Sequence, residues 1–547
     1  MTEYQHYDVA VIGYGPTGVT AANLLGAGGI SVAVIERDAQ VYSRARAIST
    51  DEEVVRIWQR AGLADRLKQD MLAERPIDFV DRDGRAFISA ELPSRGHGHP
   101  PQMFIYQPAL ERVLREGARR YPNVELRLAH ECVRVFPRED GVELMLVDLR
   151  TDEITRITAS YVIAADGGSS PTRGQLGIGF DGRTAEDRWL VVDTRMLKPW
   201  PGHDRLRFHC DPGRPAVDCP TPLGHHRWEF PVLPGEDETE LVTGDAVWRL
   251  LNRQGRTRDE VEVLRSVVYN HHVRFASRWR AGRIFLAGDA AHVMPPWIGQ
   301  GMAAGVRDAG NLCWKLIGVL SGTLPESVLD TYETERQPHV RAVARRAVLA
   351  GRIITERRRA VTRIRDIVFR AVEASPMRRR LHDLLWVPPW RHRDGFLTTA
   401  RHGAVGRTVP QPTVLDGTGT QTPLDDVTAG RWALLHRGSA PGAAGWPGLA
   451  SIEVLPAGST PRAGAVVDTG GELTTWMARH DGGVLVLRPD SVVYAAAAPG
   501  RPLPTPPDGL RPATRVPPEP ATTRPERGSP DGCRLAARAG GHRALPR

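Results

Sequence analysis

Short apolar runs alternate with glycine-rich turns and a helical pattern over the first 40 residues of the chain. Val9 to Ile12 is a continuous apolar run of the length expected of a buried strand. Residues 19–28 carry a helical pattern, and Ser31 to Ile35 forms a second apolar run that leads into Glu36. This order predicts a strand, a helix and a parallel strand, the unit that opens an α/β domain.

The turn between the first strand and the helix contains Gly13-x-Gly15-x-x-Gly18. In such a turn the first glycine permits the sharp bend, the second lets the backbone approach a pyrophosphate, and the third lets helix and strand touch. Glu36 lies 18 residues after Gly18, where an acid can bind ribose hydroxyls. The pattern predicts a binding site for the ADP part of a dinucleotide.

A second strand-to-turn unit occurs near residue 290. The apolar run Ile284 to Ala287 leads into Gly288-Asp289, a loop rich in Pro and Gly, and a helix that is predicted to begin near Met302. A carboxylate at a strand end and glycines before a helix suit a polar cofactor that needs backbone N–H donors. The helix over residues 302–320 is predicted to be amphipathic. Two such loops in this order predict two halves of one cofactor site.

A third segment completes a resemblance to a known family. Residues 162–173 contain Asp166-Gly167 and Ser170, and they are similar to the middle Asp-Gly motif of the FAD-dependent aromatic hydroxylases, a class of single-component flavoprotein monooxygenases. The three segments stand in family order, and the resemblance covers about residues 6–400. Within the class the chain most resembles 3-(3-hydroxyphenyl)propionate hydroxylases. The segments that support this likeness are residues 46–48, 51–53, 214–215, 227–230, 295–296, 299–302, 407 and 410–412.

The resemblance implies FAD as cofactor and NADH or NADPH as co-substrate. It implies that NAD(P)H reduces FAD, that O2 then forms a flavin C4a-hydroperoxide, and that this species hydroxylates a phenolic ring of a 3-(3-hydroxyphenyl)propionate-type substrate. The expected partners are this small aromatic substrate and O2. The residues expected to bind the cofactor are Gly13, Gly15, Pro16, Thr17, Gly18, Glu36, Arg46, Gln107, Asp166, Asp289, Pro296, Gly299, Gln300, Gly301 and Met302.

The residues leave the catalytic groups open. A general base that deprotonates the phenol needs a pKa near the working pH. Imidazoles are the candidates for this role, and those considered are His209, His225, His226 and His292. A substrate carboxylate could be bound by the guanidinium group of Arg207, Arg214 or Arg227, of which Arg227 is favoured.

Two positions depart from the family pattern. Ala303 stands where the family usually carries Asn, and Trp297 stands where the propionate hydroxylases usually carry Phe.

Three other functions stay open. The first alternative is a tailoring hydroxylase of an aromatic polyketide or antibiotic. The second is an FAD-dependent reductase without oxygen transfer, and the third is a catalytically inactive flavin-binding protein.

The expected fold is α/β, with a Rossmann-like FAD-binding lobe, an inserted mixed β-sheet substrate domain and a small thioredoxin-like C-terminal α/β domain. The expected boundaries are 1–182 and 276–400 for the two parts of the lobe, the second including a helical segment, and 183–275 for the substrate domain. The C-terminal domain is expected over 401–498 and a disordered tail rich in Pro and Arg over 499–547. Residues 340–385 are Arg-rich and form a candidate interface, and a homodimer is a candidate assembly.

Composition narrows the class of protein. The net charge is +8, but the tail from residue 499 holds nine Arg and four acids and so contributes five of these charges. No basic patch with interleaved aromatic residues is visible, so nucleic-acid binding is not expected. The chain has no apolar run long enough for a transmembrane helix and no pattern of a secretory signal. Its five scattered cysteines predict neither a metal site nor a disulfide framework, and a cytoplasmic location is expected.

Overall fold

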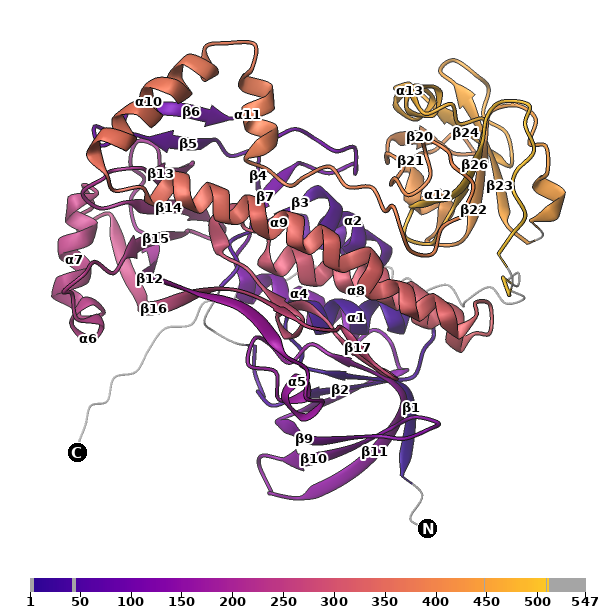
Figure 1. Ribbon diagram of the computed structural model, residues 1–547, viewed down its shortest axis with the longest axis horizontal. Helices are drawn as coiled ribbons and strands as arrows, with labels where there is room; N and C mark the ends of the chain where they lie inside the picture. The colour runs from indigo at the N-terminus through magenta and orange to yellow at the C-terminus, as the bar shows by residue number, and fades with distance from the viewer. Residues whose placement is uncertain (1–3, 42–45, 447, 508, 511–547) are drawn as a thin grey trace, which may run out of the picture. The chain divides into compact units, whose positions relative to one another are not determined.

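The computed structural model of the protein describes residues 4–41, 46–446, 448–507, 509 and 510. Most of the tail predicted over 499–547 lies outside these residues. Figure 1 shows the arrangement of the elements along the chain. The mixture of helices and sheets confirms the predicted α/β class, with a Rossmann-like lobe, an inserted mixed sheet and a C-terminal α/β domain.

An eight-stranded sheet forms the centre of the first lobe, and its main path runs in the order β17-β18-β11-β1-β2-β8. β1 pairs in parallel with β2 and β11, and β11 pairs in parallel with β18. The carboxyl ends of these strands therefore meet at one edge, where turns of an open α/β sheet bind ligands. The strands are β1 (Gln5–Ile12), β2 (Val32–Glu36), β8 (Val124–Leu128), β9 (His130–Pro137), β10 (Val142–Asp148), β11 (Ile154–Ala164), β17 (Arg280–Ala281) and β18 (Ile284–Leu286).

Helices α1 (Pro16–Ala27) and α8 (Gly301–Leu320) lie at this edge. The helix predicted over 19–28 begins earlier, at Pro16, because a proline fits the first helical turn. The helix predicted from near Met302 is confirmed, but the expectation that it is amphipathic is wrong. Residues 303–316 of α8 are all buried, because the helix is central and packs against α1, α2 (Glu52–Arg60) and α9 (Thr331–Thr355).

Close approach explains the third glycine of the first loop. A Cβ atom on Gly18 would lie 1.9 Å from the carbonyl oxygen of Gly13. We expect Gly18→Ala to lower the free energy of unfolding by about 1–3 kcal/mol, since backbone atoms would have to separate. The change should also reduce the amount of bound flavin. Thermal unfolding and flavin absorbance of the purified protein measure both effects.

Gly244→Ala is the matched control for this substitution. A Cβ atom there meets nothing within 4 Å, so stability and flavin content should stay near those of the unchanged protein. A Gly18→Ala protein that equals the control in both measurements would contradict the packing role.

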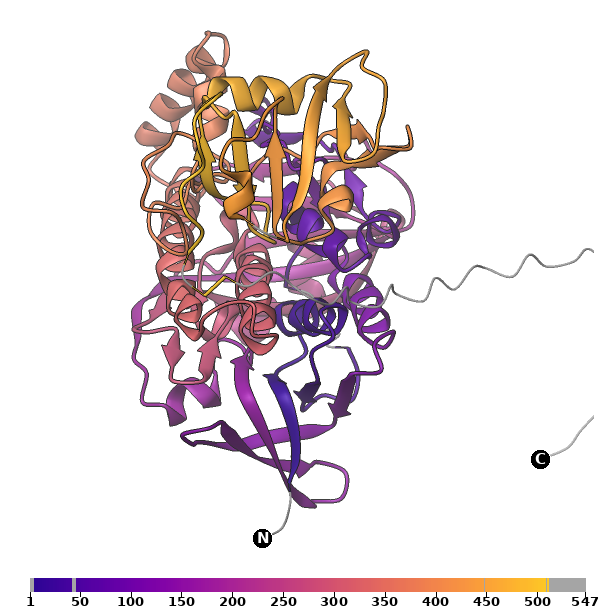
Figure 2. The same cartoon turned by 90° about the vertical axis from the view of Figure 1, so that its right-hand side faces the viewer.

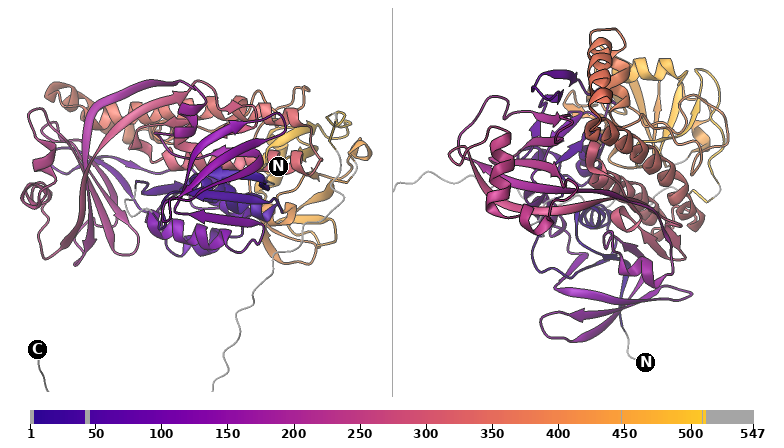
Figure 3. Two further views of the ribbon diagram at one scale, coloured as in Figure 1. Left: turned by 90° about the horizontal axis from the view of Figure 1, so that it is seen from below. Right: turned by 60° about the vertical axis from the view of Figure 1, so that its left-hand side comes forward.

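A second eight-stranded sheet has the order β19-β16-β12-β15-β14-β13-β5-β6. Its long strands β12 and β16 run side by side in Figures 1 and 3. β5 and β6 come from the first 90 residues and complete the sheet, since β5 pairs with β13 and β6 pairs with β5. The strands are β5 (Ile77–Val80), β6 (Ala86–Ala90), β12 (Phe180–Met196), β13 (Leu206–His209), β14 (Ala216–Thr221), β15 (His225–Pro231), β16 (Val261–Ala276) and β19 (His292–Val293).

Shorter elements join the two sheets. The three-stranded sheet consists of β3 (Ser49–Asp51), β7 (Gln102–Phe104) and β4 (Leu72–Ala73). The other helices of this part are α3 (Ala64–Lys68), α4 (Gln107–Ala118), α5 (Pro171–Gln175), α6 (Glu238–Leu241), α7 (Gly244–Arg253), α10 (Arg359–Glu373) and α11 (Arg378–Leu384). Within the predicted interface segment 340–385, α10 leaves Ile364 and Ile367 exposed.

The C-terminal domain has its own mixed sheet of seven strands, drawn in orange and yellow in Figure 2. It also has its own apolar core. The strand order is β21-β20-β24-β23-β22-β25-β26. The elements are β20 (Thr413–Leu415), β21 (Gln421–Pro423), α12 (Leu424–Thr428), β22 (Ala433–His436), β23 (Ala450–Pro456), β24 (Ala465–Asp468), α13 (Glu472–Arg479), β25 (Val484–Leu487) and β26 (Val493–Ala497). The cysteines that the structure describes are all buried and free.

Two structural features are absent from the described part of the chain. No helix there combines the length and the apolar character needed to cross a membrane. In the same residues no group of three or more His, Cys, Asp or Glu side chains is placed to hold a metal ion.

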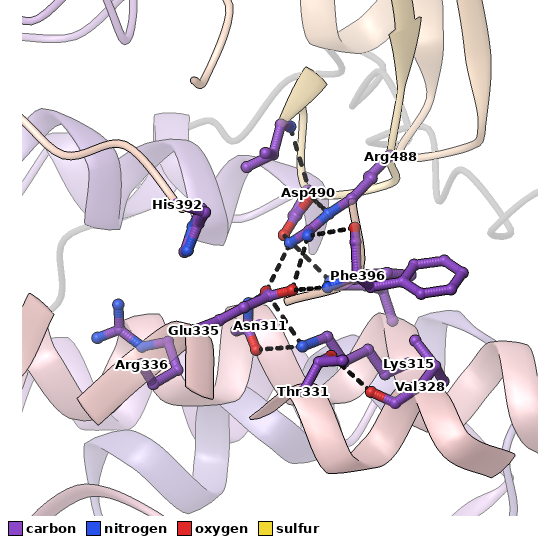
Figure 4. Close-up of polar contacts among 12 residues, drawn as sticks. Asn311, Lys315, Val328, Thr331, Glu335, Arg336, His392, Phe396, Arg488 and Asp490 are labelled. Atoms are coloured by element: carbon purple, nitrogen blue, oxygen red, sulfur yellow. Dashed lines mark hydrogen bonds and ion pairs between the residues drawn. The ribbon is translucent and has the colours of Figure 1, made fainter. Parts of the chain in front are cut away.

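A buried charge network connects the C-terminal domain to the lobe (Figure 4). Arg488 donates to both carboxylate oxygens of Glu335 on α9, each at 2.9 Å. Glu335 also lies 3.1 Å from Lys315 Nζ and accepts from Asn311 Nδ2 at 2.7 Å and from the backbone N–H of Phe396 at 2.8 Å. The side chains of Glu335, Lys315 and Arg488 are fully buried, so each charge depends on its partners.

A second ion pair between the two parts gives a pH prediction. Arg56 on α2 binds Asp425 on α12 through two hydrogen bonds of 2.7 and 2.6 Å. Burial opposes ionisation of Asp425, but Arg56 outweighs it and lowers the pKa of this carboxyl to about 2. A lowered folded-state pKa adds stability above the unfolded value near pH 4, and this stability is lost as pH falls toward 2.

We expect the unchanged protein to lose roughly 2 kcal/mol more unfolding free energy than Asp425→Asn between pH 5 and pH 2. Chemical unfolding at a series of pH values measures the two slopes. Equal slopes would show that Asp425 titrates alike in the folded and unfolded chains.

Candidate active site

One cavity of about 520 Å³ is lined both by the turns of the first sheet and by the inner face of the second. All residues predicted to bind the cofactor line it except Gly18 and Gln300. The cavity therefore brings together three segments that are far apart in the sequence, from residues 13–17, 166 and 289–302.

The end of the cavity near β1 and β2 is built by backbone donors and one acid. Gly13 has a φ of +93°, which favours glycine. A Cβ atom on Gly15 would meet nothing within 4 Å, so the backbone is open toward the cavity. The Glu36 carboxylate accepts from the backbone N–H groups of Tyr14 at 2.7 Å and Asp38 at 2.8 Å. These bonds fix the orientation of the acid.

Gln107 holds the loop that carries Arg46. Its side-chain Oε1 accepts from the backbone N–H groups of Arg46 at 2.7 Å and Ala47 at 2.8 Å. Gln107 is the first residue of α4, with Pro108 next to it, and it does not cap the helix. The Arg46 side chain is 62% exposed, and its Nη1 lies 3.6 Å from Asp289 Oδ2. This cation faces the cavity and is paired only weakly, so it can meet an anionic ligand.

Asp166 presents an acceptor without a donor. One oxygen accepts from the backbone N–H of Thr172 at 3.0 Å. The other is buried and has no hydrogen-bond partner among the described residues. Arg173 fixes this loop to the next one by donating to the carbonyl oxygens of Gly168 and Ala290. A buried, unsatisfied acceptor in a cavity wall indicates that a ligand supplies the donor.

Gln300 supports the loop before α8 from behind. Its side chain accepts from Arg307 Nη1 at 2.9 Å and so does not line the cavity. Arg307 in turn binds Asp51 at 2.7 Å and also pairs with Glu53. The side chains of Arg307 and Asp51 are each 4% exposed. This network attaches the start of α8, where Gly301 and Met302 line the cavity, to the start of α2.

The other half of the cavity is apolar. Its apolar lining side chains are Ile77, Phe79, Ala90, Leu92, Phe104, Leu206, Phe208, Val217, Met294, Trp297, Ile298, Ala350, Leu385 and Trp386, and the carboxyl of Glu229 lies among them. Trp297 takes the place of the expected Phe, and it packs edge-on against Trp189 with ring centroids 4.8 Å apart. A Cβ atom on Gly351 would lie 2.3 Å from the Trp297 ring, so this glycine makes room for the larger side chain. Ala303 on α8 belongs to the apolar core of the lobe and does not line the cavity.

None of the four imidazoles considered as general base lines the cavity. His209 and His226 lie 2.6 and 3.3 Å from the carboxylate of Asp218, and His292 lies 2.7 Å from Asp308. His225 stacks on Tyr106. In these positions the imidazoles have structural partners.

The three candidate arginines bind acids of the protein. Arg207 binds Asp218 at 2.9 Å, Arg214 pairs with Glu236, and Arg227 binds Asp193 at 2.7 Å. Arg227 also donates to the carbonyl oxygen of Arg46 at 2.9 Å. None of the three lines the cavity, so the structure does not support the hypothesis that one of them holds a substrate carboxylate.

Several lining residues were not singled out as site residues by sequence reasoning. Arg115 donates to the carbonyl oxygen of Tyr14 and stacks over its ring. Glu229 lies in the segment 227–230 that supported the family likeness, and strand alternation places it on the same face as Arg227. Leu385 and Trp386 follow α11 and reach the cavity from a distant part of the chain, for which the sequence holds no local signal.

Comparison with known proteins agrees with this geometry. Residues 6–347 match the FAD binding domain family, and residues 406–504 match the HcaD C-terminal domain family. A 3-(3-hydroxy-phenyl)propionate/3-hydroxycinnamic acid hydroxylase of Burkholderia cenocepacia (strain HI2424) is 35% identical, and the alignment covers 89% of this chain and 93% of that one. The protein of the same name from Escherichia coli (strain SMS-3-5 / SECEC) is 34% identical, with 90% and 92% covered.

A solved structure shows the same fold. The ternary complex of aklavinone-11 hydroxylase with FAD and aklavinone superposes with a TM-score of 0.73 at 22% identity, covering 91% of this chain and 97% of that one. The family matches and the curated relatives span nearly the whole described chain, and they confirm the resemblance inferred from the three motifs. The protein therefore belongs to the FAD-dependent aromatic hydroxylases, and it is a flavoprotein monooxygenase that uses FAD as cofactor.

Proposed function

We propose that the protein uses NADH or NADPH and O2 to hydroxylate a phenolic ring. The observation that carries this proposal is one continuous cavity, in which polar turns that suit a dinucleotide open directly onto a compartment lined by aromatic and aliphatic side chains. Bound FAD would supply the redox chemistry, by passing two electrons from NAD(P)H to O2.

The residues that line the polar half fit FAD. Glu36 would bind the ribose hydroxyls of the ADP part, and the open backbone at Gly13 and Gly15, together with Arg46, would bind the pyrophosphate. Asp289 would bind the ribityl chain, and the unsatisfied oxygen of Asp166 would accept a hydrogen bond from the cofactor.

The loop before α8 would contact the isoalloxazine ring of the flavin. Pro296, Gly299, Gly301 and Met302 line the cavity at the N-terminus of α8. The positive end of the helix dipole would favour the anionic reduced flavin. The apolar half would exclude water, which otherwise diverts the reduced cofactor toward release of peroxide.

Two classes of substrate have support. The names of the curated relatives favour a 3-(3-hydroxyphenyl)propionate-type substrate, which carries a carboxylate. The cavity favours an uncharged phenol, because its apolar half contains no Arg, Lys or His side chain among the described residues and does contain a carboxyl group, that of Glu229. Burying an unpaired carboxylate beside a second one is costly, so we put the uncharged phenol forward as a second candidate.

The test compares two probes that differ only in the carboxylate. Purified protein is supplied with NADH or NADPH and with either 3-(3-hydroxyphenyl)propionate or 3-propylphenol. The consumption of NAD(P)H, the uptake of O2, the release of peroxide and the product formed are then measured for each probe. Coupled oxidation that yields a dihydroxylated product supports the hydroxylase, and the better probe identifies the class of substrate. NAD(P)H consumption without oxygen incorporation for either probe would instead favour a reductase.

A further inference from the structure

A cross-strand row of side chains forms the floor of the apolar compartment. Phe79 on β5 is paired with Phe208 on β13, Phe208 with Val217 on β14, and Val217 with Glu229 on β15. Directly paired residues share one face of a sheet, and all four side chains line the cavity. The rings of Phe79 and Phe208 have centroids 4.8 Å apart. Glu229 is the polar member of an otherwise apolar row.

The Glu229 carboxyl has neither a hydrogen bond nor an ion pair with any residue that the structure describes, although only 9% of the residue is exposed. Arg227 faces the same side of β15, but its guanidinium is directed to Asp193 and to the carbonyl oxygen of Arg46. Burial raises the pKa of Glu229, Arg227 acts in the opposite sense, and Asp193 adds to the rise. A buried carboxyl without a partner, exposed only to a ligand cavity, indicates that the ligand supplies the partner.

Resting on the function proposed above, we infer that Glu229 binds the ring hydroxyl of the substrate as a hydrogen-bond acceptor and takes up its proton as the ring is oxygenated. The hydroxyl is the donor that a phenol brings and that the apolar walls cannot satisfy. Phe79, Phe208 and Val217 would contact the face and edge of the ring. A substrate that carries a carboxylate would place it in the same cavity as the Glu229 carboxylate, so this role favours the uncharged phenol of the two candidates.

The proton transfer balances with the hydroxylation. As a ring carbon gains a bond to one oxygen atom derived from O2, the O–O bond to the other oxygen atom breaks, and that atom leaves as water with the two electrons that NAD(P)H supplies. The O–H bond of the substrate breaks at the same time, and its electron pair moves into the ring. The proton passes to the Glu229 carboxylate. The oxygenated ring carbon then loses its hydrogen as a proton, which is used in forming the water, and the ring becomes aromatic again. Glu229 returns its proton to the original oxygen. The carboxylate is then restored for the next turnover.

The first experiment measures binding alone. Dissociation constants of 3-propylphenol and 3-propylanisole for the FAD-loaded full chain are obtained from changes in flavin absorbance, without NAD(P)H. The unchanged protein should bind the phenol roughly ten- to a hundredfold more tightly, because only the phenol donates to Glu229. Glu229→Leu should reduce this preference to about one. Equal binding of both probes by the unchanged protein, or a preference that survives Glu229→Leu, would overturn the inference.

The second experiment separates binding from proton transfer. Glu229→Gln keeps the shape and an acceptor oxygen but cannot take a proton. We expect the rate of coupled hydroxylation to fall by roughly a hundredfold or more while the dissociation constant of 3-propylphenol changes by less than about tenfold. An unchanged rate would overturn the catalytic part. Glu262→Gln, on the exposed side of β16 with a half-exposed side chain, is the matched control and should leave both values unchanged.

The two proposals fail in different ways. If the unchanged protein binds the phenol selectively but never couples NAD(P)H oxidation to product, the hydroxylase proposal fails and the binding role of Glu229 stands. If hydroxylation is coupled but Glu229→Gln and Glu229→Leu behave like the unchanged protein, the hydroxylase proposal stands and Glu229 has no role. Flavin content and circular dichroism of each variant show that it is folded.

Discussion

Arg488→Met is expected to lower the free energy of unfolding by about 3–5 kcal/mol, because it leaves the buried charge of Glu335 without its main partner. Arg488 makes two of the hydrogen bonds to this carboxylate, and both side chains are fully buried. Burial opposes ionisation of Glu335, but Arg488 and Lys315 outweigh it and hold its pKa well below the usual range. In the variant, Lys315 alone would have to compensate the charge.

The loss should appear first where the C-terminal domain meets α9. Hydrogen exchange of the C-terminal domain, together with chemical unfolding of the whole chain, measures this effect. Arg462→Met is the matched control, since Arg462 pairs with Glu453 on an exposed surface, where its side chain is 60% exposed. An exposed pair contributes about 0–1 kcal/mol. Arg488→Met with an effect as small as the control would show that the network does not hold the domain.

A double variant tests the assignment to the pair. Arg488→Met leaves the charges of both Glu335 and Asp490 without their arginine. Glu335→Gln removes the first of these charges, so the combined loss should be smaller than the sum of the two single losses. Strict additivity would mean that the two residues act independently.

Arg307→Met is expected to have a comparable effect on stability and an additional effect on cofactor binding. Arg307 binds Asp51 and Glu53 and donates to Gln300 next to the loop that enters the cavity. Its removal leaves two carboxylates without a counter-charge, which typically costs about 3–5 kcal/mol when a buried pair is broken. The freed Gln300 no longer fixes the start of α8, so the amount of FAD bound per chain should fall as well.

The stability loss caused by Arg307→Met should depend on pH. Burial opposes ionisation of Glu53, but Arg307 outweighs it and holds the pKa of Glu53 well below its ordinary value. The stability that this shift provides is present above the unfolded pKa near 4 and is lost only at lower pH. Without Arg307 the Glu53 carboxylate takes up a proton more readily. The difference between Arg307→Met and the unchanged protein should therefore be larger at pH 7 than at pH 4.

Two comparisons make this prediction specific. Arg66→Met removes an arginine that is 49% exposed from its pair with Asp70 on the surface, and it should change neither stability nor FAD content appreciably. Arg307→Lys keeps the charge but loses the forked geometry of the guanidinium group. Its FAD content should therefore lie between that of Arg307→Met and that of Arg66→Met. An Arg307→Met protein with full FAD content would contradict the link from Arg307 through Gln300 to the cofactor loop.

The elements that the sequence predicted best are those that local rules control. The strands at Val9 and Ile284, the helix from near Met302 and the turn at Gly13 depend on runs of apolar residues, positive φ and close approach of backbone atoms. These properties are readable within a window of about 20 residues. They were enough to predict the α/β class and the FAD-dependent hydroxylase family.

The error about α8 has a different origin. The sequence of this helix predicts one buried face, but burial depends on how many elements surround a helix. Because α1, α2 and α9 pack around it, even Arg307, Asp308 and Lys315 are buried. Each of these charges is compensated by a partner from another element, and no local pattern announces such a partner.

By itself, then, the sequence determined the backbone framework of this protein, its glycine turns and the family to which it belongs, because these follow from short segments. Only the tertiary structure decided which charges are paired and which remain free. Arg227 could have bound a substrate, but Asp193 from a neighbouring strand neutralises it. Glu229 became the carboxyl of the cavity without a hydrogen bond or ion pair among the described residues, because strand register places it beside Val217 and the guanidinium of Arg227 on the same face is bonded to Asp193. Such pairings depend on distances between elements that only folding brings together.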